Sequence, residues 1–319
     1  MSRPAGLARK AALRLKPTGD WWRGFWRLAD PKIALASLTS LFLGACLAAS
    51  QQRLAWGWLA LTVFGILAIE IGKHASGDIF DLRGDLLVAP HERSPFSGGR
   101  RVIVDGLLTK RQTAVIAVAA YAVAAACGLL ICLLREPGIL KLGLFGVACA
   151  YFYNAPPVRL SSRGLGEIAV GLCYGPLICL GTAWVQLRHR DPSAAALGLP
   201  LGLMIAAFLV ANEFPDYNAD FSSGKFNMVV RLGRPRAAAV YFWLSVCAGA
   251  FVIALGLSDF GPGLWLGLLA LIPAGLASRA LILRPTEIKS IIEAQKLALA
   301  AFVLMAVAES AGLLLVRWP

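Results

Sequence analysis

Three aspartates are spaced at helical intervals in a short polar stretch, residues 77–85 (GDIFDLRGD). Asp78, Asp81 and Asp85 are three and four residues apart, so a helix would carry all three carboxylates on one face. His74, four residues before Asp78, falls on the same face. Like charges on a helix face repel one another by a few tenths of a kcal/mol per pair, and a bound cation would relieve that repulsion.

A second stretch, residues 212–220 (NEFPDYNAD), repeats the pattern. Asn212, Asp216 and Asp220 are each four residues apart and share a helix face, although Pro215 is expected to bend that helix. Mg²⁺ takes oxygen ligands, and it typically binds through one or two carboxylates together with substrate phosphates. Two facing clusters of this kind predict Mg²⁺ ions that bridge a diphosphate and neutralise it as a leaving group. The alternative, a solvated acidic helix end, is less favoured for a matched pair than for one cluster alone.

Long apolar segments must position these clusters. Hydrophobic residues make up 58% of the 319 residues, charged residues only 15%, and the mean hydropathy is +0.68. A soluble domain would carry about a quarter charged residues, so the bilayer is the natural solvent for this chain. One crossing takes about 20 residues of helix. We therefore predict an all-α bundle of nine transmembrane helices, at residues 33–50, 54–73, 113–134, 139–154, 164–186, 193–213, 237–257, 260–283 and 296–316.

The net charge of +13 is distributed between the apolar runs, which is typical of topology signals and contacts to anionic membrane lipid. A nucleic acid partner is not expected, because the basic residues do not gather on one polar domain. With a cytoplasmic N-terminus, both acidic clusters begin long cytoplasmic loops, 74–112 and 214–236. Of the 31 Lys and Arg, the outer side would then hold Arg53, Arg135, Lys141, Arg188, Arg190 and Arg317.

We expect two parts in the chain, a cytoplasmic and interfacial segment at residues 1–30 and a nine-span domain at residues 31–319. Trp21, Trp22 and Trp26, with arginines between them, predict a helix at the membrane surface. A cleaved signal peptide is not expected, since no apolar run follows the basic start within the first thirty residues. The seven cysteines all fall in apolar runs without a CxxC pair, which favours small packing residues over metal ligands or disulfides.

The two clusters resemble the motifs of the UbiA superfamily of intramembrane prenyltransferases, which have the forms NDxxDxxxD and NxxxDxxxD or DxxxDxxxD. Their spacing matches at residues 77–85 and 212–220. Residues 153–167 (YNAPPVRLSSRGLGE) and 223–233 (SGKFNMVVRLG) are similar to other cytoplasmic stretches of that family, above all in the branch that prenylates 1,4-dihydroxy-2-naphthoate in menaquinone synthesis. One position departs from the pattern. Gly77 stands where the family usually has Asn, so the first cluster lacks a side-chain amide there.

The resemblance implies Mg²⁺-dependent transfer of a prenyl group from a polyprenyl diphosphate to an aromatic acceptor, which we expect to be 1,4-dihydroxy-2-naphthoate. Guanidinium and ammonium groups suit phosphate oxygens, so neighbouring basic residues are expected to contact the diphosphate, or otherwise to act as topology signals. The expected diphosphate contacts are Arg159, Arg163, Lys225 and Arg231. The expected metal ligands are Asp78, Asp81, Asp85, Asp216 and Asp220, with Asn212 as a further catalytic residue.

Two alternatives stay open. The first is a prenyltransferase of the same superfamily with another acceptor, such as 4-hydroxybenzoate, homogentisate, a porphyrin or a glycerol phosphate lipid. The second is a cation-coupled secondary transporter, which is less favoured because transporter sites usually lie near the bilayer midplane. We expect a multi-pass protein of the inner (plasma) membrane, with its active site on the cytoplasmic side and without an obligate protein partner. Glu309, inside the last span, is interpreted as structural.

Overall fold

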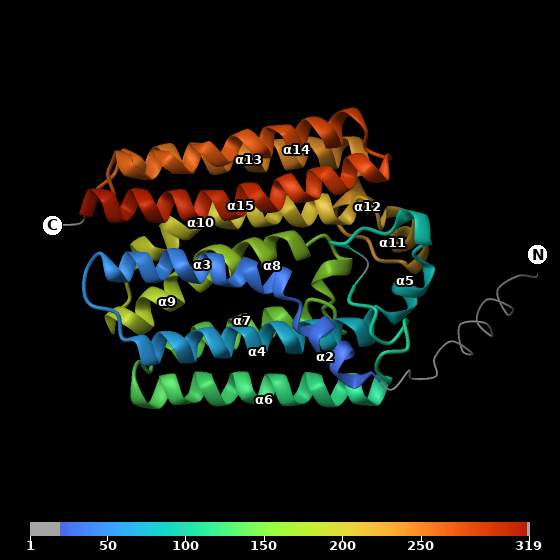
Figure 1. Ribbon diagram of the computed structural model, residues 1–319, viewed down its shortest axis with the longest axis horizontal. Coiled ribbons are helices and arrows are strands. Elements are labelled where there is room, and N and C mark those ends of the chain that lie inside the picture. The colour runs from blue at the N-terminus through green and yellow to red at the C-terminus, as the bar shows by residue number, and fades with distance from the viewer. Residues whose placement is uncertain (1–19, 98, 318–319) are drawn as a thin grey trace, which may run out of the picture.

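The structure, a computed structural model, describes residues 20–97 and 99–317, so most of the predicted interfacial segment lies outside it. Within these ranges every regular element is helical and there is no strand, as predicted. The longer helices run side by side along one direction (Figure 1). In chain order the elements are α2 (Trp21–Ala29), α3 (Pro31–Ala49), α4 (Trp56–Phe80), α5 (Leu82–Leu87), η1 (Pro90–Glu92), α6 (Lys110–Leu134), α7 (Ile139–Phe152), η2 (Leu160–Ser162), α8 (Gly166–Leu172), η3 (Cys173–Leu177), α9 (Ile178–Leu187), α10 (Pro192–Glu213), α11 (Tyr217–Ser223), α12 (Met228–Leu232), α13 (Arg234–Gly256), η4 (Pro262–Ala270), α14 (Leu271–Leu283) and α15 (Ile288–Arg317).

Seven helices in the described part of the chain are long and apolar enough to cross a membrane. They are α4, α6, α10, α13, α15 and the composite helices α8–α9 and η4–α14. An eighth span results if α2 and α3, which meet at a bend of 41°, count as one. α7 has 14 residues, which is short for a crossing. The chain is therefore a multi-pass membrane protein. The length and composition of its helices support seven or eight crossings and do not confirm the nine predicted from the sequence.

The helix α4 continues beyond the predicted end of its span. The apolar run ends near Lys73, but the helix extends to Phe80, and α5 follows after Asp81 alone. The backbone N–H of Asp85 donates to the carbonyl of Asp81 at 3.0 Å, so the chain stays close to helical across the junction. The first acidic cluster consequently lies on helix, as its spacing predicts, and the long loop begins at residue 88 instead of residue 74.

The helix α10 forms the centre of the bundle, and 72% of its most apolar stretch is buried. It packs against α8, η3, α13 and α15. Glycines allow η3 to approach it closely, because a Cβ added to Gly175 would lie 2.5 Å from backbone atoms of Gly198 and Gly202. η3 is a π-helical turn that contains Pro176, and such turns within α-helices often occur at functional sites.

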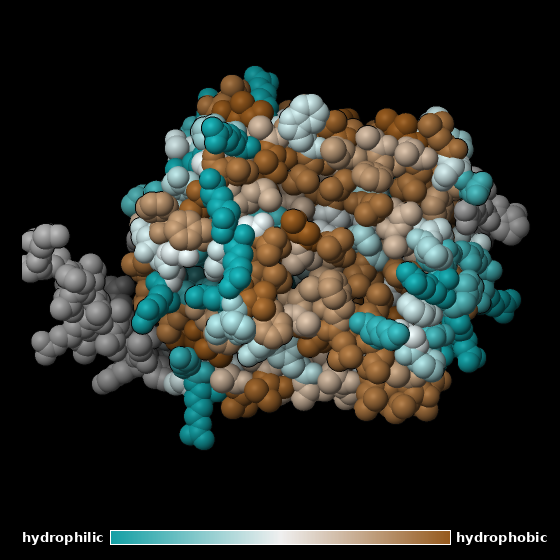
Figure 2. Space-filling view, turned by 180° about the vertical axis from the view of Figure 1, so that it is seen from behind, coloured by the Kyte–Doolittle hydropathy of each residue, from teal (hydrophilic) through white to brown (hydrophobic). Residues whose placement is uncertain are grey.

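Apolar side chains cover the sides of the bundle. Large exposed ones include Leu133 on α6, Trp243 on α13 and Ile272 on α14. Figure 2 shows a broad apolar region across one face, with polar groups gathered toward the ends of the bundle. Such a surface suits lipid rather than water. The helix α2 forms as predicted, and it exposes Trp22 and Trp26.

Short helices and loops close one end of the bundle. α5 packs against α11, which also contacts α12, at the right-hand end in Figure 1. The loop at residues 88–109 adds a small second core, in which Val102 and Leu108 pack with Leu28 of α2 and Ala75 of α4. The contact of α5 with α11 brings the ends of α4 and α10, and hence both acidic clusters, to the same end of the molecule.

Candidate active site

Both acidic clusters line one polar cavity of about 120 Å³ at the closed end of the bundle. Pro215 falls in the break between α10 and α11, where the sequence predicts a bend. The side chains that follow this break therefore turn back toward the end of α4. The five aspartates predicted as metal ligands, Asp78, Asp81, Asp85, Asp216 and Asp220, all belong to the wall of this cavity.

Lys225 lies between the two clusters. Gly224 ends α11 with a φ of +78°, a conformation that glycine favours, and Lys225 follows directly. The Nζ of Lys225 is 3.6 Å from Oδ1 of Asp220 and 4.0 Å from Oδ2 of Asp81. Burial lowers the pKa of Lys225, but the two carboxylates outweigh burial and raise that pKa well above its ordinary value. The two carboxylates therefore favour the ammonium form of Lys225 in the cavity.

Burial raises the pKa of both carboxyl groups at the α4–α5 junction, Asp81 and Asp85. For Asp81, the charges of Lys225 and Arg159 partly offset burial. For Asp85, repulsion from Asp78 and Asp81 adds to burial, and its pKa is raised to about 8. A cation bound beside Asp85 would relieve both effects, so the site favours a positively charged ligand.

The carboxylate of Asp78 anchors a loop. Its Oδ1 accepts hydrogen bonds from the backbone N–H groups of Arg100 at 2.9 Å and Arg101 at 3.1 Å. Its Oδ2 accepts one from the N–H of Val102 at 2.7 Å. Both oxygens thus fasten the 88–109 loop to the end of α4, and a metal-binding role for Asp78 stays a prediction.

The anchored loop passes close to the acidic cluster. Gly99 has a φ of +66°, and a Cβ added there would lie 2.7 Å from Oδ2 of Asp85. Arg100, the next residue, lines the cavity and forms an ion pair with Asp30, which follows α2. The loop therefore covers one side of the cavity, and glycine is required at the point of closest approach.

The predicted diphosphate contacts divide into two groups. Lys225 lines the cavity, whereas Arg159, Arg163 and Arg231 do not. Arg159 is exposed, but its charge acts on Asp81. Arg163 and Arg231 are also exposed, and each donates to a backbone carbonyl of a nearby loop, at 2.9 and 2.7 Å. Direct contact of these three arginines with a diphosphate remains a prediction.

Three other residues singled out from the sequence have distinct surroundings. His74 lines the cavity, and its Nδ1 is 2.9 Å from the carbonyl oxygen of Leu28, so it ties α4 to α2. Asn212 is partly buried and does not line the cavity. Glu309 is fully buried in α15, where a Cβ added to Gly267 would lie 2.9 Å from its Cγ, and it belongs to neither acidic cluster.

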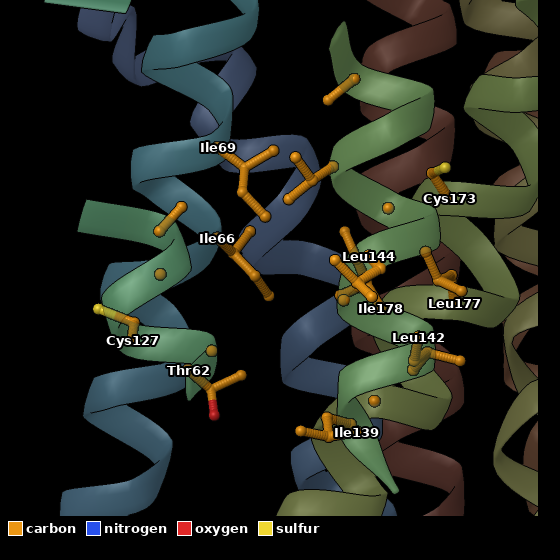
Figure 3. Close-up of a pocket in the computed structure, with 18 of the residues that line it drawn as sticks. Thr62, Ile66, Ile69, Cys127, Ile139, Leu142, Leu144, Cys173, Leu177 and Ile178 are labelled. Carbon is orange, nitrogen blue, oxygen red and sulfur yellow. The ribbon is translucent and has the colours of Figure 1, made fainter. Parts of the chain in front are cut away.

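A second cavity, of about 460 Å³, adjoins the polar one and extends between α4, α6, α7 and α8–α9. Its lining is mostly aliphatic, and Ile66 of α4 faces Leu144 of α7 and Ile178 of α9 across the space (Figure 3). Lys73 and Tyr153 line both cavities and so mark their junction. The two cavities thus place a polar, charged wall next to an aliphatic one. We refer to the larger cavity as the apolar chamber.

Two charged side chains, Glu70 and Lys73, stand in the wall of the apolar chamber. The Nζ of Lys73 is 3.0 Å from Oε2 of Glu70, and it also donates to the hydroxyl of Tyr174. Oε1 of Glu70 accepts from that hydroxyl and from Ser37 at 2.6 Å. This charge-balanced cluster connects α3, α4 and η3 beside the junction.

Sequence reasoning missed several of these residues. Glu70 and Lys73 carry a readable signal, because an ionisable pair inside a span usually faces a cavity. Arg100 carries none, since it has no helical spacing to the acidic clusters, and Asn154 is marked only by its place in residues 153–167, the stretch that resembles a cytoplasmic loop of the family. Only the tertiary packing brings them to the cavity wall.

The donor set fits Mg²⁺ bound jointly with a substrate. Among the residues that the structure describes, no three His, Cys, Asp or Glu side chains converge into a ready-made metal site. Carboxylates from both clusters nevertheless share one small cavity, and hard oxygen donors are what Mg²⁺ takes. Mg²⁺ commonly uses one or two carboxylates and completes its shell with water and phosphate oxygens. The site therefore suits a metal–diphosphate complex better than a bare ion.

The lipid-facing bundle, the acidic cavity with its lysine and the adjoining apolar chamber together define an intramembrane enzyme for amphipathic substrates. The profile of the UbiA prenyltransferase family matches residues 37–309. The 1,4-dihydroxy-2-naphthoate octaprenyltransferase of Mycobacterium tuberculosis is 30% identical over 256 residues, which cover 79% of this chain and 82% of that protein. The protein of the same name from Bacillus subtilis is 23% identical over 227 residues, covering 69% and 71%.

Solved structures share the fold. An apo UbiA homologue from Aeropyrum pernix K1 has a TM-score of 0.61 at 20% identity, covering 88% of this chain and 97% of that one. A UbiA homologue from Archaeoglobus fulgidus bound to GPP and Mg²⁺ has a TM-score of 0.55 at 16% identity, covering 90% and 99%. The chain belongs to the UbiA prenyltransferase family, and it is a prenyltransferase.

Proposed function

We propose that this enzyme transfers a polyprenyl group from a polyprenyl diphosphate to 1,4-dihydroxy-2-naphthoate in menaquinone biosynthesis, with Mg²⁺ as its cofactor. The observation that carries the proposal is the junction of the two cavities at Lys73 and Tyr153. A diphosphate in the polar cavity can continue through this junction as an isoprenoid chain in the apolar chamber. In this position the charged head of the substrate would lie in polar surroundings and its apolar tail in apolar surroundings.

The acidic cavity supports the part of the proposal that concerns binding and departure of the diphosphate. Asp81, Asp85, Asp216 and Asp220 would hold Mg²⁺, which when bound neutralises the diphosphate and favours its departure. Lys225 places a fixed positive charge on the same phosphate oxygens. Asp78 keeps the 88–109 loop over the cavity, and this cover limits access of water to the reactive prenyl cation.

Two observations support the proposed aromatic acceptor: the names of the related proteins and the polar cluster around Glu70. The related proteins from M. tuberculosis and B. subtilis carry the name 1,4-dihydroxy-2-naphthoate octaprenyltransferase. In an otherwise apolar chamber, Lys73 offers a donor and Glu70 offers an acceptor next to the junction. Hydroxyl and carboxylate oxygens of an aromatic acceptor would find partners there, with the ring close to the first carbon of the prenyl chain.

The bond changes of the proposed reaction balance without an oxidant. The C–O bond to the diphosphate breaks, and its electron pair leaves with the diphosphate. A ring carbon of the acceptor supplies the pair that forms the new C–C bond. Aromaticity returns when the ring releases a proton, or carbon dioxide where the attacked carbon carried the carboxyl group. The ring of Tyr153 at the junction can stabilise the intervening allylic cation through its π face.

The proposal includes the orientation of the protein. The charge distribution supports a plasma-membrane protein whose N-terminus and polar cavity face the cytoplasm, since basic residues predominate on that side. Membrane lipid is the expected surrounding, and the substrates are the expected partners.

The test is an activity assay with the full chain purified into lipid nanodiscs. Labelled polyprenyl diphosphates and Mg²⁺ are supplied with 1,4-dihydroxy-2-naphthoate, 4-hydroxybenzoate or homogentisate, and the products are identified by mass spectrometry. We expect a prenylated naphthoquinol that disappears with EDTA and in Asp81→Ala. Prenylation of a different acceptor would overturn the acceptor half. Absence of Mg²⁺-dependent transfer to any acceptor would overturn the proposal, and cation-coupled uptake into liposomes would favour a transporter.

A further inference from the structure

Asn154 occupies the space that the missing side chain of Gly77 would need. A Cβ added to Gly77 would lie 2.9 Å from Nδ2 of Asn154, which is closer than side chains normally approach. Position 77 is where the first acidic cluster departs from its family pattern by lacking an asparagine. A carboxamide is therefore present at this point of the cavity, but it comes from a different part of the chain.

The backbone around Asn154 is held firmly. The residue lies two positions after the end of α7, and the N–H of Ala155 donates to the carbonyl of Tyr151 at 3.1 Å. The carbonyl of Tyr153 accepts the N–H of Ser161 at 2.9 Å, which closes the loop from α7 to η2. The carboxamide of Asn154 is thus presented to the cavity from a fixed backbone.

The two polar atoms of the Asn154 carboxamide differ in their hydrogen bonding. Its Nδ2 donates to Oδ2 of Asp81 at 2.8 Å. Its Oδ1 is buried, and it has no hydrogen-bond partner among the described residues. Asn154 lines the polar cavity together with Asp81 and Asp85. An amide oxygen is a suitable ligand for Mg²⁺ and a suitable acceptor for a metal-bound water.

We propose that Asn154 supplies from the α7–η2 loop the carboxamide that position 77 lacks. In this role its N–H₂ group orients the carboxylate of Asp81, and its Oδ1 binds the Mg²⁺ of the metal–diphosphate complex or a water on that ion. The inference rests on the proposed function, since it concerns the same metal site. Gly77 and Asn154 then form a coupled pair, because a side chain at position 77 would displace the Nδ2 of Asn154 that donates to Asp81.

The test is a relocation of the amide. Four proteins are compared in nanodiscs: wild type, Asn154→Ala, Gly77→Asn and the double variant Gly77→Asn with Asn154→Ala. The first readout is Mn²⁺ affinity, measured by electron paramagnetic resonance with an unreactive prenyl diphosphonate. The second is turnover. Asn154→Ala is expected to weaken Mn²⁺ binding roughly tenfold or more, as loss of a group that orients a metal ligand typically does. Gly77→Asn alone is expected to weaken it through crowding, and the double variant is expected to recover most of the loss.

A further variant separates polarity from packing. Asn154→Leu keeps the volume of the side chain but removes both hydrogen-bonding groups, so it should weaken Mn²⁺ binding as much as Asn154→Ala. Circular dichroism and metal-free melting temperatures identify variants that do not fold, and the Leu variant keeps the test decisive if Gly77→Asn is one of them. Wild-type Mn²⁺ affinity in folded Asn154→Ala or Asn154→Leu would overturn the inference. Absence of Mn²⁺ binding in the wild type would instead overturn the proposed function.

Discussion

The Nζ of Lys225 lies 3.6 Å from Oδ1 of Asp220, within the cavity that both acidic clusters line. A lysine in that place holds the two clusters together before any metal binds, because Asp81 is within 4.0 Å of the same nitrogen. The ammonium group also remains positioned for phosphate oxygens when a substrate enters. Lys225 therefore has a different role from the exposed Arg231, although both follow the second cluster in the sequence.

This difference predicts separate effects for two substitutions. Lys225→Gln removes a charged donor inside the cavity, and hydrogen bonds to charged groups contribute about 1.5–3 kcal/mol. We expect its KM for prenyl diphosphate to rise roughly 10- to 100-fold. Arg231→Gln removes an exposed side chain that donates to a loop carbonyl at 2.7 Å, so its KM should stay within about threefold of wild type. Steady-state kinetics with varied prenyl diphosphate provide the measurement, and equal effects of both substitutions would contradict the assignment.

Asp78 and Asp81 are also predicted to behave differently. Asp78→Asn puts an amide donor against backbone N–H groups that now donate to a carboxylate, so the 88–109 loop should loosen. We expect faster tryptic cleavage within that loop, with Mn²⁺ binding in the presence of a prenyl diphosphonate largely kept. Asp81→Asn should have the opposite effect, a protected loop and lost Mn²⁺ binding. A protected loop in Asp78→Asn, combined with lost Mn²⁺ binding, would show that Asp78 acts as a ligand instead.

The carboxyl group of Asp85 predicts a pH dependence of stability. Its pKa is raised in the folded protein from an ordinary 3.8 to about 8, first by burial and then by Asp78 and Asp81. The folded state therefore keeps a proton that the unfolded chain releases above about pH 4. The stabilisation of the fold that comes from the protonated Asp85 is complete below the pKa of this group in the unfolded chain. It is lost as the pH rises through about 8, the pKa in the folded protein. Without Mg²⁺, the melting temperature should fall between about pH 4 and pH 8.

Two controls test this assignment to Asp85. Asp85→Asn cannot titrate, so its melting temperature should change less over the same pH range. Glu293→Gln, an exposed change on α15, should keep the wild-type slope. Addition of Mg²⁺ with a prenyl diphosphonate should flatten the wild-type slope, because the bound cation stabilises the ionised carboxylate. An unchanged slope in Asp85→Asn would contradict the prediction.

The parts of the site that the sequence predicts are those set by local geometry. Spacings of three and four residues place carboxylates on one helix face whatever the rest of the chain does, and hydropathy marks most of the helices. The two clusters meet because the ends of α4 and α10 lie at the same end of the bundle. Pro215 marks a real break in the second cluster for an equally local reason.

The parts that the sequence does not predict depend on contacts between distant segments. The loop that Asp78 anchors lies 22 to 24 residues further along the chain, and Asn154 is 73 residues from Asp81. Three predicted phosphate-binding arginines, Arg159, Arg163 and Arg231, have long and flexible side chains that do not line the cavity. Helical periodicity carries no information on such pairings, since it describes one segment at a time.

The apolar chamber predicts a limit on prenyl chain length. Gly128 of α6 lines the chamber, and a Cβ added there would meet no atom within 4 Å. Gly128→Phe should therefore occupy part of the roughly 460 Å³ without displacing the wall. Longer prenyl diphosphates then lose their space first, and crowding of this kind costs about 1–3 kcal/mol. We expect kcat/KM for an octaprenyl substrate to fall roughly tenfold or more, with geranyl diphosphate little affected.

An equimolar mixture of chain lengths provides the measurement, since the product ratio by mass spectrometry reports the competition directly. Gly57→Phe is the matched control, because a Cβ there also meets nothing within 4 Å but the residue lies at the start of α4, outside the chamber. Its product ratio should equal that of wild type. If Gly128→Phe folds and turns over with an unchanged ratio, the prenyl chain does not lie along α6. A shift toward short products in Gly128→Phe alone would place the chain between α4 and α6, on the side of the chamber opposite η3.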